Sequence, residues 1–600
     1  MKKMTDQITR KQILCILAAV LVLLAVLAGI RRFSPQEDPS ADQSEQGLTM
    51  SFVKAAAKNA IKELKLVLAD IQENDLDSAR ERISDLYRTV DSVRAPVERS
   101  ISLFGSNAQL RKKLEKVMVL LDTADMALTE IAVPAIDLLE AYPISGLKVG
   151  DGFDTKLVGH YLDFAESVMP QIGQVLDCAN SIDLQELDGD GEISGYLELA
   201  NQIVEIYRND PSVISMLKAM LGVDEDRLYV VAVQNPVEIR ASGGFPGSVG
   251  TMRIQDGVLT VGDFQSVTYM LSSSKPKDIQ ITNEEWELFN YLSGIQTPKD
   301  ADLCPDFERV GHIWASAYEE MHREPVAGVL AVTPHIVQRI LNATGQTIEL
   351  FDGLVMNGEN AMEVLLHDIY FKYFSQDYVA DREKISDDLF ADAAAKTMGI
   401  LTDNVSISQF LKYIPVLKES VEDRTLMLWM KDETEQAFVT KAGLDGGLNS
   451  DPRNPAAGVY FNCILPSKMG WYFLMDTQIG ERTGNEDGSY TYPVTVVFNN
   501  NATEDEMQIA ATYITGGMSG SIRGTAYFFA PAGGSVSEFT VSSGQKIQMK
   551  TYHGLELGFM DAFVLKPNTP ITITYRVTTA PGVEKHLEIS KTPTAQLGDG

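Results

Sequence analysis

A short run of polar residues and glycines follows an apolar segment of the chain, and its residue types suit the binding of an anion. The segment Leu228–Val233 is apolar and β-branched, as expected of a buried strand. After it the sequence reads QNPVEIRASGGFPGS, in which Arg240 offers a planar guanidinium to a phosphate or carboxylate. Gly243 and Gly244 let backbone N–H groups approach a ligand, and Ser248 adds a hydroxyl. The pattern predicts an anion site at the end of the strand.

A diphosphate at this place would need further cations or a metal to offset its charge. Arg253 and Arg382 are the candidates to join Arg240. The carboxylates that could hold magnesium beside them are Glu238, Asp377 and Asp381. The alternative for Arg240 is an ion pair with Glu238 or another acid. For the two glycines, it is a hairpin turn that requires a positive φ.

An acidic stretch, ELDGDGEIS at residues 186–194, has part of the spacing of a calcium-binding loop. Its candidate ligands are Glu186, Asp188, Asp190 and Glu192. Gly191 falls at the sharp-turn position, but Leu197 stands where the pattern needs a bidentate glutamate. The stretch therefore predicts a calcium site, with an acidic loop between two helices as the alternative.

The segment around Arg240 resembles the QN-x-x-E-x-R-x-x-GGF-x-G-S signature of bacterial envelope proteins catalogued as domain of unknown function 4012. The matching residues are Gln234, Asn235, Glu238, Arg240, Gly243, Gly244, Phe245, Gly247 and Ser248. The resemblance extends to about residue 575. Because that family is uncharacterised, the resemblance implies an architecture and an envelope location rather than an activity.

The middle part of the chain, through segments between residues 328 and 382, resembles, more distantly, the LytR-CpsA-Psr phosphotransferases of bacterial cell walls. The stretch GVLAVTPHIVQRILNATGQTIEL is similar to that family's strand, helix and strand, and MNGENAMEVLLHD is similar to its L-x-G-E-x-A-L helix start. Asp377-Tyr378 and Asp381-Arg382 stand where that family has its D-x-x-R segment. Its strand-end P-R-D motif is absent. The resemblance implies a lipid-linked pyrophosphate as ligand.

The N-terminal part of the chain has the pattern of a membrane anchor. Residues 1–12 are basic, and residues 13–30 contain no charge over a length that can span a bilayer as a helix. The basic end predicts a cytoplasmic tail, with everything after the span outside the cytoplasm. A cleaved signal peptide is the alternative. Residues 31–48 are polar and predict a flexible linker.

Apolar spacing divides the rest of the chain into three parts. Residues 49–222 have apolar stripes at three- and four-residue steps, which predict a helical bundle. Residues 223–420 alternate strand-like and helix-like segments, as in a layered α/β domain. Residues 421–590 contain many short strand-like segments separated by turns, which predict an antiparallel β-sandwich, and residues 591–600 form a tail. The expected fold class is a multidomain α+β protein.

The net charge and the cysteine content argue against several classes of function. The formal net charge of −32 argues against nucleic-acid binding. The four cysteines are scattered and predict neither a disulfide framework nor a metal site.

Two functions remain open. The first is binding or transfer of a lipid-pyrophosphate-linked glycopolymer in the cell envelope, assisted by magnesium. The alternative is a non-catalytic surface scaffold or adhesion protein with a carbohydrate- or protein-binding sandwich. Arginines facing one cleft would favour the first, and a cleft without convergent cations the second.

Overall fold

The computed structural model describes part of the chain in detail. The described residues are 63, 66–67, 69–71 and 74–597, except 104–107, 182–191, 375–380 and 403–406. The expected tail, membrane span and linker at residues 1–48 lie outside them, as do Glu186, Asp188 and Asp190 of the acidic loop. Within the described ranges, no helix is long and apolar enough to cross a membrane.

Two compact units make up the chain, and the mixed α+β fold class is confirmed. The first contains Met1–Glu225, Asp256–Val258 and Asn404–Leu411. The second contains Asp226–Gln255, Leu259–Asp403 and Lys412–Gly600.

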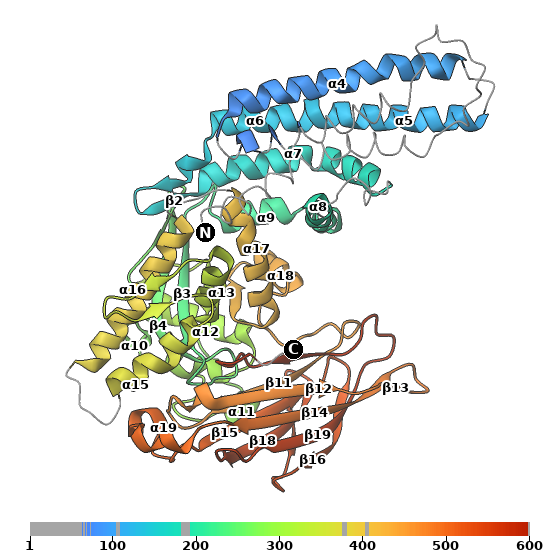
Figure 1. Cartoon of the computed structure of the whole chain (residues 1–600). Coiled ribbons are helices and arrows are strands. Elements are labelled where there is room, and N and C mark those ends of the chain that lie inside the picture. The colour runs from blue at the N-terminus through green and yellow to red at the C-terminus, as the bar shows by residue number, and fades with distance from the viewer. Residues whose placement is uncertain are drawn as a thin grey trace. The chain divides into compact units, whose positions relative to one another are not determined.

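Helices dominate the first unit. They are α4 (Leu76–Leu103), α5 (Ala108–Met126), α6 (Val133–Ala141), α7 (Thr155–Asn180), α8 (Glu192–Asn209) and α9 (Val213–Met220), with a π-helical turn η3 (Ala127–Ala132) joining α5 to α6. In Figure 1, α4, α5 and α7 run lengthwise beside one another. Their apolar stripes form one core, in which Leu121 and Ile131 are fully buried. The short strands β1 (Lys148–Val149) and β2 (Gly152–Asp154) pair as a hairpin.

The second unit begins with a mixed sheet. Its strands are β3 (Arg227–Asn235), β4 (Phe245–Gln255), β5 (Val258–Val261), β6 (Gln265–Ser266), β7 (Gly328–Val332) and β10 (Leu426–Met430), in the order β5-β4-β3-β7-β10 with β6 beside β4. β3 and β4 form the expected antiparallel hairpin, and β3 is parallel to β7. A parallel neighbour requires a long crossover, which here contains α10 (Val267–Met270), α11 (Asn283–Phe289), the 3-10 helix η5 (Pro298–Leu303) and α12 (Phe307–His322).

Further helices follow the parallel strand. They are α13 (His335–Thr344), α14 (Ala361–Glu363), the π-helical turn η6 (Val364–Asp368), α15 (Ile369–Phe374), α16 (Arg382–Thr402), α17 (Ile407–Glu422) and α18 (Glu433–Lys441). A two-residue hairpin, β8 (Ile348–Glu349) with β9 (Val355–Met356), separates α13 from α14.

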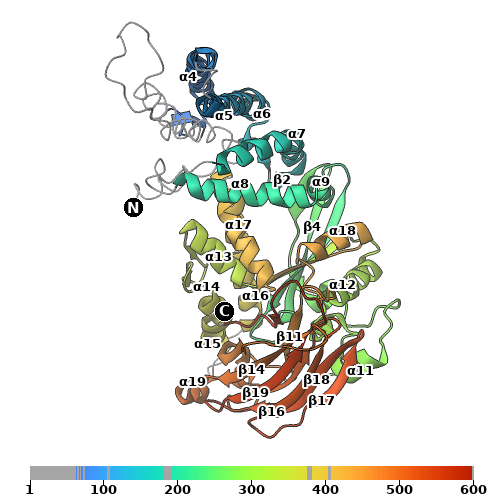
Figure 2. The same cartoon turned by 90° about the vertical axis from the view of Figure 1, so that its right-hand side faces the viewer.

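The C-terminal part of the second unit contains two five-stranded sheets. One has the order β17-β18-β15-β11-β20, and the other has β12-β14-β19-β16 with β13 beside β14. The strands are β11 (Ala456–Cys463), β12 (Phe473–Ile479), β13 (Thr483–Gly484), β14 (Tyr490–Asn500), β15 (Ile522–Phe529), β16 (Ser535–Val541), β17 (Gln548–Tyr552), β18 (Leu555–Leu565), β19 (Ile571–Thr578) and β20 (Glu588–Lys591). Short helices η7 (Met469–Tyr472), α19 (Glu504–Ile509) and α20 (Thr512–Thr515) connect them. In Figure 2 the strands of both sheets lie together in the orange to red part of the second unit.

The sheet that contains β11 is buried on both faces. On one face, Phe461 packs edge-on against Phe498 of the other sheet, with ring centroids 5.7 Å apart. On the opposite face, Tyr460 and Tyr527 belong to the core that includes α11 and α12. The Tyr527 hydroxyl donates to the carbonyl of Leu288 at 2.8 Å. Because β11 is covered on both sides, its residues are buried almost continuously rather than alternately.

Candidate functional site

The signature segment, Gln234–Ser248, forms the turn between β3 and β4 and contacts the strands that follow the mixed sheet. The backbone N–H of Cys463 donates to the carbonyl of Ile239 at 3.0 Å, and that of Gly470 donates to the carbonyl of Val237 at 3.0 Å. The Ala241 N–H donates to the side chain of Asn462 at 2.7 Å. The segment is therefore joined by its backbone to the end of β11 and to η7.

Arg240 lies inside this junction with only 3% of its surface exposed. One guanidinium nitrogen, Nη1, donates to the carbonyl oxygens of Ile239 and Cys463 at 3.3 and 3.2 Å. The other, Nη2, lies 3.5 Å from Oδ1 of Asp300, and Nε lies 4.0 Å from Oδ1 of Asp302. This geometry favours the ion-pair alternative, with acids of η5 as the partners instead of Glu238.

Glu238 has a different cationic partner. Its Oε1 forms an ion pair with Nζ of Lys468, which also lies 4.5 Å from the centroid of the Tyr370 ring. Burial acts to lower the pKa of Lys468, but Glu238 and Tyr370 together raise it above its ordinary value. Because Glu238 is occupied by this lysine, it is not placed to serve as a magnesium ligand in this arrangement.

The two signature glycines have backbone conformations that other residues rarely adopt. Gly243 has φ +108° and Gly244 has φ +119°. A Cβ atom at Gly244 would lie 2.3 Å from the carbonyl oxygen of Asn235. The Gly243 N–H donates to the carbonyl of Arg240 at 3.1 Å. The glycines therefore build a tight turn, and Ser248 lies within β4 opposite Val233.

The other two predicted arginines have partners of their own, and Arg253 lies apart from Arg240. Arg253 pairs across the hairpin with Leu228 at the beginning of β3, whereas Arg240 follows the end of that strand. The Arg253 guanidinium forms a two-pronged ion pair with Glu324, at 2.5 and 2.9 Å, which lowers the pKa of Glu324. Arg382, at the start of α16, lies over the Phe374 ring at 5.2 Å.

The predicted metal ligands are only partly within the described residues. Asp377 lies outside them, and Asp381 precedes α16 with φ +56°. Of the acidic loop, only Glu192 is placed, as the first residue of α8. The calcium and magnesium sites stay predictions.

Two acids that sequence reasoning missed, Asp300 and Asp302, complete the surroundings of Arg240. Asp302 is fully buried, and neither of its carboxyl oxygens has a hydrogen-bond partner. Burial raises its pKa well above the ordinary value, although the nearby guanidinium of Arg240 acts in the opposite direction. Nothing in the sequence links this pair of acids to an arginine some sixty residues earlier.

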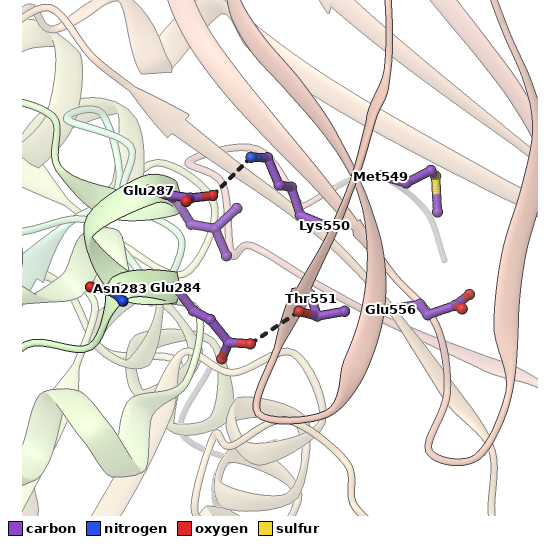
Figure 3. Close-up of a pocket in the computed structure, with 8 residues that line it drawn as sticks. Asn283, Glu284, Glu287, Met549, Lys550, Thr551 and Glu556 are labelled. Carbon is purple, nitrogen blue, oxygen red and sulfur yellow. Dashed lines mark hydrogen bonds and ion pairs between the residues drawn. The ribbon is translucent and has the colours of Figure 1, made fainter.

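The described structure also has an open hollow, drawn in Figure 3. It has a volume of about 530 Å³ and is lined by α11 and the β17–β18 hairpin, through Asn283, Glu284, Glu287, Leu288, Met549, Lys550, Thr551 and Glu556. Lys550 Nζ lies 2.8 Å from Glu287, and the Thr551 hydroxyl donates to Glu284 at 3.0 Å. Sequence reasoning singled out none of these residues, because they come from segments more than 250 positions apart.

A second hollow of about 600 Å³ lies beside the first. It is lined by β16, β17 and the turn between them, and Met549 borders both hollows with 52% of its surface exposed. We call the two together the β17 groove. β17 is the edge strand of its sheet, so the groove includes residues of a strand that has a neighbouring strand on one side only.

Replacing Arg240 by alanine should lower the free energy of unfolding by about 3–5 kcal/mol, because it leaves buried acids without their cation. The matched control is Arg253→Ala, whose ion pair is partly exposed and should be worth at most about 1 kcal/mol. Urea denaturation of both variants measures the difference. Equal, small losses in the two variants would contradict the structural role of Arg240.

The stability contributed by Asp302 should depend on pH. Its carboxyl holds a proton more tightly in the folded chain than in the unfolded chain, where its pKa is about 4. At pH values above that value, the folded state therefore holds more protons than the unfolded state does. The free energy of unfolding then decreases as pH rises. The Asp302→Asn side chain cannot ionise, so this variant should lose less stability than the original chain between mildly acidic and neutral pH. The urea midpoint of each protein, measured at both pH values, gives the two losses. If the urea midpoints of the two proteins changed by the same amount with pH, the proposed contribution of Asp302 would be refuted.

Comparison with known proteins supports the resemblance seen in the signature segment. Residues 224–370 match the family model described as Protein of unknown function (DUF4012). Neither the curated proteins nor the solved structures contain a match to the chain. The likeness to LytR-CpsA-Psr phosphotransferases stays a hypothesis. The matched segment includes Arg240, Asp300 and Asp302, whereas Asn462 and Cys463 lie beyond it. The similarity to the DUF4012 family therefore covers residues 224–370 and not the rest of the chain.

Proposed function

We propose that the protein is a non-catalytic scaffold of the cell envelope whose β-sandwich binds a basic segment of a partner protein. The observation that carries this proposal is the burial of Arg240 among its own acids and carbonyl groups. A pyrophosphate would have to displace these partners to reach the guanidinium. Glycopolymer transfer, the other hypothesis, needs cations that converge on one cleft, and Arg240 and Arg253 are separated by the length of β3.

The charge of the β17 groove favours a cationic ligand. In its first hollow, Glu284, Glu287 and Glu556 face a single cation, Lys550. Lys550 is already paired with Glu287, which leaves an excess of negative charge. Complementary charge steers the encounter of partners and excludes the wrong ones. An anionic glycopolymer would be repelled here, and lysines or arginines of a protein would be attracted.

The shape and apolar parts of the groove favour a protein segment over a carbohydrate. None of the eight side chains that line the first hollow is aromatic, and Phe539 in the second hollow is stacked on the ring of Tyr575, with centroids 4.9 Å apart. Met549 instead offers an exposed, flexible thioether, which adapts to varied apolar side chains. An edge strand beside the hollow also suits an extended peptide.

The envelope location rests on the sequence. A basic tail followed by the uncharged residues 13–30 supports a membrane anchor, with the bulk of the chain outside the cytoplasm. The resemblance of the signature segment to envelope proteins supports the same location. A scaffold anchored in this way would present its sandwich to partners at the cell surface.

A fluorescent peptide of alternating lysine and leucine should bind the full chain, and a glutamate–leucine counterpart should not. The double variant Glu287→Gln/Glu556→Gln should bind the lysine peptide roughly tenfold more weakly, as expected for the loss of two exposed attractions. Binding should also weaken as salt is added. Fluorescence anisotropy measures all three effects.

The matched control is Glu486→Gln/Glu584→Gln, which removes the same charge from exposed positions outside the groove. It should bind the lysine peptide like the original chain. Equal weakening in the two double variants would reduce the effect to net charge and contradict the groove. Preferential binding of a polyanion such as a teichoic acid would instead favour glycopolymer handling.

A further inference from the structure

A π-helical turn places three potential metal ligands on one side of the chain. Glu363 is the last residue of α14, and His367 and Asp368 end η6. These residues are at positions i, i+4 and i+5. In a π-helix the backbone hydrogen bonds join residues i and i+5, so each turn contains more residues than a turn of an α-helix. The residues at i+4 and i+5 therefore lie on the same side of the helix as residue i. One donor atom from each residue lies within 4.8 Å of the others.

The imidazole of His367 is fixed by contacts on all sides. Its Nδ1 lies 2.9 Å from Oδ1 of Asp368, and its Nε2 lies 3.3 Å from Oε1 of Glu506 and 3.4 Å from the hydroxyl of Tyr472. The ring centroid lies 4.5 Å from that of Phe371. Only 16% of the His367 side chain is exposed. A histidine held in this way is already oriented to present Nδ1 toward Asp368.

Negative charge is in excess around the imidazole ring of His367. The carboxylates of Glu363, Asp368 and Glu506 gather around one imidazole. Within the ranges that the structure describes, no lysine or arginine forms an ion pair with any of these three acids. The nearby Lys372 is paired with Asp352. A divalent cation would offset this excess of negative charge.

We propose that Glu363, His367 and Asp368 bind a first-row divalent cation of the Zn²⁺ class, through two carboxylate oxygens and Nδ1 of the imidazole. Mixed nitrogen and oxygen donors are the set that such ions accept. Glu506 is the positioning residue, because its Oε1 lies 3.3 Å from Nε2 on the side of the ring away from Nδ1, where carboxylates commonly orient metal-bound histidines. Three protein ligands leave a coordination position for water, and the exposed Glu363 opens the site to solvent.

Metal binding would also join two parts of the second unit. The three ligands belong to the helices α14 and η6, whereas Glu506 lies on α19 between strands of the C-terminal sheets. A cation that binds only the folded chain raises its thermal stability by mass action. Zn²⁺ should therefore raise the melting temperature.

The test uses the full chain, purified in detergent without a histidine tag and stripped of metal. Isothermal titration with Zn²⁺ should show one site, and Co²⁺ should give the visible absorption of a protein-bound ion. His367→Ala should lower the affinity at least about 100-fold, and Glu506→Gln about tenfold with the stoichiometry unchanged. His586→Ala removes an exposed histidine elsewhere and should bind like the original chain.

Glu363→Gln keeps the test decisive if His367→Ala does not fold, because Glu363 is exposed and its substitution should leave the fold intact. It should weaken Zn²⁺ binding and abolish the rise in melting temperature. An original chain that binds no Zn²⁺ below about 100 µM would overturn the proposal. So would Glu363→Gln and His367→Ala variants that both bind with unchanged affinity.

Discussion

The structure of the second unit depends on the burial of one guanidinium group. An arginine cannot give up its charge, and a buried charge is costly unless hydrogen bonds and an opposite charge surround it. Arg240 obtains them from three directions: the carbonyl of its neighbour Ile239, the carbonyl of Cys463 at the end of β11, and the acids of η5. The turn, the crossover and the first sandwich strand must therefore meet at this point. Glu238 and Lys468 form a second ion pair that is largely buried, at the same junction between the turn and the sandwich.

This constraint explains why the signature segment of this chain, Gln234–Ser248, combines charged residues with glycines. Glu238 and Arg240 each neutralise a charge at the junction, and Gly243 and Gly244 let the chain reverse where a side chain would collide with the preceding strand. Because the sheet containing β11 is buried on both faces, the junction extends from these polar contacts into a continuous apolar core. The signature then marks how the domain is joined to the sandwich, while ligand-accessible features lie elsewhere, in the β17 groove and around His367.

Local features of the fold were predictable from sequence, and long-range partners were not. Apolar spacing located the buried stripe that includes Leu121, and the β-branched run at Leu228–Val233 located β3. For Arg240, the sequence left an ion pair and an anion site open, because its partner at residue 300 is fixed only by the folded crossover. Burial of β11 on both faces was missed, since a sandwich pattern predicts one wet face. The Glu363–His367–Asp368 group was missed because Asp368, five residues after Glu363, joins the i and i+4 pair where the helix has a π-helical turn.

Native-state hydrogen exchange tests the central claim, that the signature segment joins the mixed sheet and the sandwich into one cooperative body. The amides of Cys463 and Gly470 donate to carbonyls of the signature segment. If the claim holds, they exchange only through the opening that also exposes the central amides of β3, with the same free energy and the same dependence on denaturant. Exchange of Cys463 and Gly470 at a free energy several kcal/mol below that of β3 would show that the sandwich separates on its own, and would contradict the account.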